Sequence, residues 1–166
     1  NCPTLASSDA PCSALSVVYA SDGSVERYQF YPNNPDLVLV DTTLVARAPR
    51  RFLVSGMGDA LCKLYEGAQA RVANGLNLFG GRNTIAAEQI SIACDRVIRA
   101  DAEAGLQALA RREPDAAFER LTEALVLLSG LALARPTLPA ALIAAATVLA
   151  FLAHEPWLVA LGHRGE

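Results

Sequence analysis

The sequence predicts a mainly α-helical protein in which a β-hairpin and a short strand precede a helical bundle. Three observations predict it. Apolar and polar residues alternate only in the part of the chain before Asp41, as in half-buried strands. Apolar residues recur at helical spacing through most of the remainder. The chain has 166 residues, of which 52% are hydrophobic and 19% charged, enough for one domain with a sizeable core.

The hairpin is predicted over residues 15–31. Residues 15–19 and 25–31 form the two strands, the second alternating clearly, and Asp22-Gly23 between them is a dipeptide typical of tight turns. A turn-rich cluster follows, and the apolar run 37–40 then fits a short buried strand.

Helices are predicted from Asp41 onward. Asp41 caps a short helix over about 42–48, and Pro49 stands at the favoured first position of a long one. Further helices are expected over about 83–110 and from Pro114 onward.

Two apolar runs, 124–134 and 140–153, lie near the end of the chain. Each is shorter than the roughly 18 residues that span a bilayer as a helix. A buried helical hairpin is therefore the preferred interpretation. Association of residues 124–161 with a membrane surface is a weaker alternative.

Charge and cysteine content narrow the function classes. A net charge of −3 without a basic run argues against nucleic-acid binding. The cysteines are far apart and form no CxxC pair, so we expect buried free thiols and a cytoplasmic location; they are Cys2, Cys12, Cys62 and Cys94. Lys63 is the only lysine, and we assign it no mechanistic role.

The stretch Gly56-Met57-Gly58-Asp59 stands inside the long predicted helix. Each interior glycine costs about 1 kcal/mol relative to alanine, so we expect another group to approach the backbone closely there. A buried Asp59 would require a cation or a hydrogen-bonding partner. The alternatives are an Asp59 on a partly exposed helix flank, or one paired with Arg50 or Arg51.

The segment 4–13 is small, polar and turn-like. One interpretation is a Ser-Asp helix cap before a turn; the other is a loop that faces a cofactor, with Asp9 directed at a substrate hydroxyl. The sequence contains no GxGxxG, P-loop, GxSxG or HExxH motif, and Gly80-Gly81 alone is too weak to predict a phosphate site.

Three segments in this order, 3–19, 33–42 and 56–61, resemble the NAD-dependent glycerol dehydrogenases of the iron-containing alcohol dehydrogenase family. The similarity continues to about residue 132. Members of this family pair an N-terminal α/β nucleotide-binding domain with a C-terminal helical domain, and the active site lies between the two.

The resemblance implies a truncated member with three parts. Residues 1–41 would be the end of the nucleotide-binding domain, 42–132 the helical metal and substrate domain, and 133–166 a divergent apolar helical tail or a frameshifted reading. Apolar surface exposed by the truncation would favour a homo-oligomer.

The resemblance also implies site residues. Asp9 would contact the polyol, and Asp59 would bind a divalent metal, usually zinc. His163, in a His-Arg-Gly-Glu run similar to the family's His-Gly-Glu, is a candidate second metal ligand, whereas the family's other histidine position falls on Leu142. Seven residues match the NAD site: Thr4, Leu5, Ala6, Ser7, Ser13, Leu15 and Tyr19.

The implied activity is oxidation of glycerol to dihydroxyacetone with NAD, in which the metal lowers the pKa of the alcohol. Because the metal and cofactor sites are incomplete, we expect little or no turnover from this chain. The alternative is a non-catalytic helical association module derived from the same family.

Overall fold

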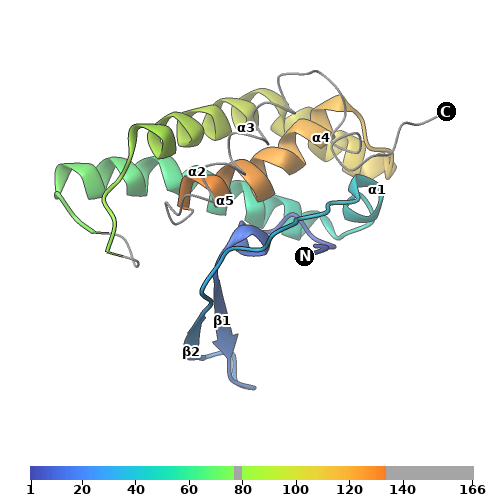
Figure 1. The fold of residues 1–166 in the computed structure, drawn as a ribbon. Helices are drawn as coiled ribbons and strands as arrows, with labels where there is room; N and C mark the ends of the chain where they lie inside the picture. Colours follow the sequence, from blue (N-terminus) through green and yellow to red (C-terminus); the bar gives the residue numbers. More distant parts are fainter. Residues whose placement is uncertain (77–79, 134–166) are drawn as a thin grey trace. The chain divides into compact units, whose positions relative to one another are not determined.

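The computed structural model describes residues 1–76 and 80–133, where a two-stranded sheet is followed by packed helices (Figure 1). This arrangement confirms the predicted fold class. The elements, in chain order, are the 3-10 turn η1 (Ala10–Cys12), β1 (Leu15–Tyr19), β2 (Val25–Phe30), α1 (Thr42–Val45), α2 (Arg50–Val72), α3 (Ile85–Arg111), α4 (Ala116–Glu123), the π-helical segment η2 (Ala124–Leu128) and α5 (Ser129–Leu133).

The hairpin forms where the sequence predicts it. β1 and β2 are antiparallel, with Leu15 opposite Phe30 and Val17 opposite Tyr28. Gly23 has a φ of 85°, a left-handed conformation that glycine adopts without strain and that the turn requires.

Three cross-strand pairs of this hairpin are apolar, and their side chains share one face because residues paired across the strands point to the same side. The apolar hairpin face consists of Leu15, Val17, Tyr19, Val25, Tyr28 and Phe30. All but Leu15 are exposed, Tyr19 by 62% and Tyr28 by 57%. The hairpin therefore adds little to the buried core of the described residues.

The predicted short strand at 37–40 does not belong to this sheet. Its segment is held instead by the first residue, since the Asn1 amino group donates to the Leu37 carbonyl (2.7 Å) and the Leu39 N–H donates to the Asn1 carbonyl (2.8 Å). Leu37 is 53% exposed, whereas Val40 is buried. The apolar run thus supplies one core residue, Val40. It forms no strand of the sheet, because its backbone pairs only with Asn1 and not with a longer neighbouring strand.

Side-chain caps set three of the helix starts. The Asp41 carboxylate accepts from the N–H groups of Thr43 and Leu44, which confirms the predicted cap of α1. Thr84 caps α3, and Asp115 caps α4 just after Pro114. The long helix predicted from Pro49 is α2.

The core lies where α3 packs against α2, α4 and η2 (Figure 1). Cys94 and Ile98 face it from α3, and Phe118, Leu121 and Leu125 face it from α4 and η2. The predicted step of three and four residues from Phe118 to Leu125 thus marks a buried face.

Several predictions fall on residues 134–166, which lie outside the described residues; they include the second apolar run, Leu142 and His163. Among the helices of residues 1–76 and 80–133, none has the length and apolar character needed to cross a membrane.

Candidate functional site

The loop before η1 packs directly on α2 at Gly56. A Cβ on Gly56 would lie 2.1 Å from the Ala6 carbonyl oxygen and 3.2 Å from Cδ1 of Leu125. Ala6 is itself only 1% exposed. The predicted close approach is therefore confirmed at Gly56, and it seats the segment 4–7 on the helix.

Gly58 behaves differently. It is exposed, and a Cβ added there would meet nothing within 4 Å. The prediction of a close approach is wrong for this glycine as far as the described residues reach.

The same packing brings Asp9 to Asp59, although the two residues are far apart in sequence. The backbone N–H of Asp9 donates to Oδ2 of Asp59 over 3.4 Å. Asp9 precedes η1, but its carboxylate does not cap that turn. Ser8 Oγ makes only a long hydrogen bond, accepting from the Ala10 N–H at 3.4 Å. The Ser-Asp cap thus fails to account for Asp9.

The carboxylates of Asp9 and Asp59 share one cation, the ammonium group of Lys63. Lys63 Nζ lies 3.6 Å from Oδ2 of Asp9 and 3.4 Å from Oδ1 of Asp59. The side chains of Lys63 and Asp9 are only 10% and 14% exposed, and that of Asp59 is 31% exposed. We call these three residues the Asp-Lys-Asp cluster. Because the cluster is mostly removed from water, its ion pairs are screened less than surface pairs.

Lys63 is the residue that the sequence analysis missed. The available clue was its spacing, since an aspartate and a lysine four residues apart on a helix lie on the same face. Neither Arg50 nor Arg51 is the observed ion-pair partner of Asp59; the Arg51 guanidinium lies 4.6 Å from the ring centroid of Phe52.

The cluster shifts the protonation equilibria of Asp9 and Lys63. Burial raises the pKa of Asp9, and the Asp59 charge adds to this while Lys63 opposes it. Burial lowers the pKa of Lys63, but the carboxylates of Asp9 and Asp59 outweigh burial and raise it overall. The ammonium therefore stays charged at neutral pH.

The residues predicted to line the NAD site are placed unevenly. Ala6 is buried against α2, Leu5 and Ser7 are half-buried, and Thr4 is exposed. Ser13 follows η1 directly, and Leu15 begins β1, whereas Tyr19 lies at the opposite end of that strand. The structure thus places all but Tyr19 on or next to the loop and η1, and their role toward NAD stays a prediction.

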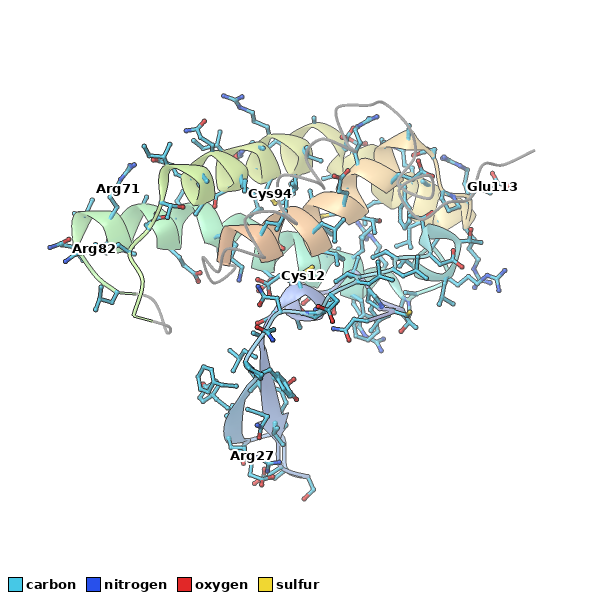
Figure 2. The ribbon with its side chains drawn as sticks, viewed as in Figure 1. Cys12, Arg27, Arg71, Arg82, Cys94 and Glu113 are labelled. Atoms are coloured by element: carbon cyan, nitrogen blue, oxygen red, sulfur yellow. The ribbon has the colours of Figure 1, made fainter. Side chains whose placement is uncertain are left out.

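Two cysteines bind carbonyl groups of η2, one from η1 and one from α3. Cys12 lies on η1 and Cys94 on α3 (Figure 2). The Sγ of Cys12 donates to the Val126 carbonyl and that of Cys94 to the Ala124 carbonyl, each over 3.2 Å. Burial raises the pKa of both thiols to about 12. All four cysteines are free, as predicted, but Cys2 and Cys62 are exposed, so the expectation that all are buried is wrong.

The residues described here do not fit a divalent metal ion. Protein zinc sites supply three or four ligands, and residues 1–76 and 80–133 contain no group of three or more His, Cys, Asp or Glu side chains placed to hold one. The two carboxylates of the cluster already face an ammonium group. His163, the predicted second ligand, lies outside the described residues.

Similar proteins were found among curated sequences, although no protein-family model matches the chain. The glycerol dehydrogenases of Thermotoga maritima and Citrobacter freundii are each 43% identical over 129 residues, which is 78% of this chain and 35% of theirs. Glycolaldehyde reductase of Halobacterium salinarum is 40% identical over 129 residues, again 78% of this chain and 35% of that protein.

Two solved structures of similar fold also come from glycerol dehydrogenases or probable ones. The glycerol dehydrogenase of Schizosaccharomyces pombe has a TM-score of 0.74 at 43% identity, covering 79% of this chain and 33% of that one. A probable glycerol dehydrogenase of Sinorhizobium meliloti has a TM-score of 0.74 at 42% identity, covering 79% of this chain and 37% of that one. The chain thus spans about a third of the length of these relatives. Over that span its sequence and fold are similar to those of the glycerol dehydrogenases.

Proposed function

We propose that this chain carries part of an active site of the glycerol dehydrogenase type, whose reaction is the oxidation of glycerol to dihydroxyacetone with NAD. The observation that carries the proposal is the packing of the segment 4–7 on α2, which brings Asp9 beside Asp59. Homology at 43% identity with glycerol dehydrogenases supports it.

Asp9 is proposed as the residue that contacts the polyol. Its carboxylate is partly buried and can accept a hydrogen bond from a glycerol hydroxyl, which would orient the carbon that loses hydride. The half-buried loop residue Ser7, and Ser13 just after η1, would lie along the cofactor. When bound, NAD supplies the hydride acceptor.

The resemblance suggests a metal, zinc, at Asp59 and His163. Since the described residues do not fit this ion, we assign no step to it, and we propose that this chain alone has little or no turnover. Free thiols at Cys2 and Cys62 agree with a reducing compartment, and we place the protein in the cytoplasm.

Two measurements on the purified chain test this proposal. With glycerol, NAD and added zinc, we expect no appreciable metal-dependent formation of NADH. In an NMR titration with glycerol, we expect the amide resonances of residues 7–13 to shift, and Asp9→Asn to weaken the response several-fold. Glycerol-independent spectra would contradict the polyol site, whereas zinc-dependent NADH formation would contradict the predicted inactivity.

A second candidate is a non-catalytic module that associates with another copy of itself. The observation favouring it is the apolar hairpin face, where Val17, Tyr19, Val25, Tyr28 and Phe30 are each at least 37% exposed. Such a surface on a folded domain commonly marks a contact with another protein.

A further inference from the structure

We propose that the Lys63 ammonium is a built-in cation that occupies the position between the carboxylates of Asp9 and Asp59 and keeps a divalent metal ion out of that position. The inference concerns which cation the carboxylates bind. It therefore stands or falls independently of whether the chain oxidises glycerol.

The geometry shows that the ammonium serves both carboxylates. Its nitrogen lies within 3.6 Å of one oxygen on each, and the second oxygen of Asp59 accepts from the Asp9 backbone N–H. An ammonium group has three donors, enough for two carboxylates. Both oxygens of Asp59 are thus engaged by the protein itself.

Burial explains why a cation is needed here. The two carboxylates carry like charges, and Asp9 is only 14% exposed, so without a cation they would repel each other in poorly solvated surroundings. A zinc ion could neutralise them, but it would need at least one further ligand, which the described residues do not place here. Lysine needs none.

Covalent tethering favours lysine further. Lys63 stands four residues after Asp59 on α2, so its ammonium is present at a high effective concentration whatever the concentration of free metal. A metal ion would have to displace this group and leave a charged lysine with little access to water, since the side chain is 10% exposed.

Zinc titrations of the apo chain by calorimetry, together with thermal unfolding, test the proposal without NAD or glycerol. Lys63→Met removes the charge and keeps most of the length of the side chain; we expect a lower melting temperature that zinc restores, and zinc binding at least tenfold tighter than in the wild type. Asp59→Asn in the Lys63→Met background should abolish that restoration. Lys63→Arg, which keeps the charge, should respond to zinc as the wild type does.

Two results would overturn it. One is saturable zinc binding by the wild type that Asp59→Asn removes, because the ion would then be displacing Lys63. The other is a Lys63→Met variant that melts at the wild-type temperature and gains nothing from zinc. If Lys63→Met does not fold even with zinc, the comparison of wild type with Asp59→Asn decides alone, and zinc binding that does not depend on Asp59 supports the proposal.

Discussion

Single atoms decide how the loop and α2 fit together. At Gly56 the helix has a hydrogen where any other residue has a Cβ, and the Ala6 carbonyl oxygen occupies that space. The loop that carries Asp9 could not lie so close to α2 otherwise. A Cβ added at Gly58, by contrast, would meet no atom within 4 Å among the described residues.

These two glycines form a matched pair for mutation. Gly56→Ala should lower the free energy of unfolding by about 2 to 4 kcal/mol, because the added methyl collides with the backbone and the loop must move. Gly58→Ala should raise it by about 0.5 to 1 kcal/mol through better helix propensity. Urea denaturation of both variants measures this, and equal effects would show that the loop does not pack as described.

Glu123 is a buried acid that the Asp-Lys-Asp cluster does not include. Glu123 is 7% exposed, and burial raises the pKa of its carboxyl group from 4.5 to about 7. The described residues provide no hydrogen-bond partner for its carboxylate. Between pH 4.5 and about 7 the folded state therefore holds more protons at this site than the unfolded state, so folding stability falls as the pH rises through that window.

Glu123→Gln removes this pH dependence. We expect the variant to exceed the wild type in unfolding free energy by about 1 to 3 kcal/mol at pH 8, with the advantage shrinking toward pH 4.5. Denaturation curves at several pH values measure it. A difference between the two proteins that stays constant with pH would contradict the assignment.

At the scale of elements, η2 is the segment on which the others converge. Three of its carbonyl groups accept side-chain hydrogen bonds: Ala124 from Cys94, Leu125 from Ser129, and Val126 from Cys12. A π-helical turn departs from the regular hydrogen-bond ladder of an α-helix, as where the Ser129 N–H donates to the Ala124 carbonyl five residues earlier, and the three side-chain donors bind carbonyls of this irregular segment. η1 also packs closely on α5, because a Cβ on Gly130 would lie only 2.5 Å from Cβ of Cys12.

The hairpin is the element with the least burial. An isolated two-stranded sheet is marginally stable in water, and this one presents its apolar face to solvent. The sequence predicts a homo-oligomer, and the apolar hairpin face is the surface we propose for it.

Substitution on that face tests the association. We expect the wild-type chain to sediment as a dimer and Tyr28→Ser, which removes a 57% exposed aromatic ring, to shift the equilibrium at least tenfold toward monomer. Val72→Ser, at an apolar residue 81% exposed on α2, is the control and should leave the dimer intact. Analytical ultracentrifugation measures all three proteins, and a monomeric wild type would rule the association out.

At the scale of the molecule, the described residues form a helical core to which the loop and η1 are attached. An ion pair between Arg120 and Asp101 joins α4 to α3. Its two nitrogen to oxygen distances are 2.9 Å and 2.8 Å. The TM-score of 0.74 with the glycerol dehydrogenase of Schizosaccharomyces pombe shows that a similar arrangement occurs in that longer protein. The stability of this core thus depends on α3, which contacts α2, α4, η2 and α5.

The sequence by itself determined the elements, because caps, turns and periodicity act between residues close in the chain. Asp41 specifies the start of α1, and Gly23 specifies the hairpin turn. The strand predicted at 37–40 did not form, because a strand also needs a neighbouring strand to pair with. Only the tertiary structure determined that Lys63 is the cation shared by Asp9 and Asp59. Lys63 meets Asp59 within one helix, but Asp9 joins them only because Ala6 packs on Gly56, and no local pattern encodes a contact across fifty residues.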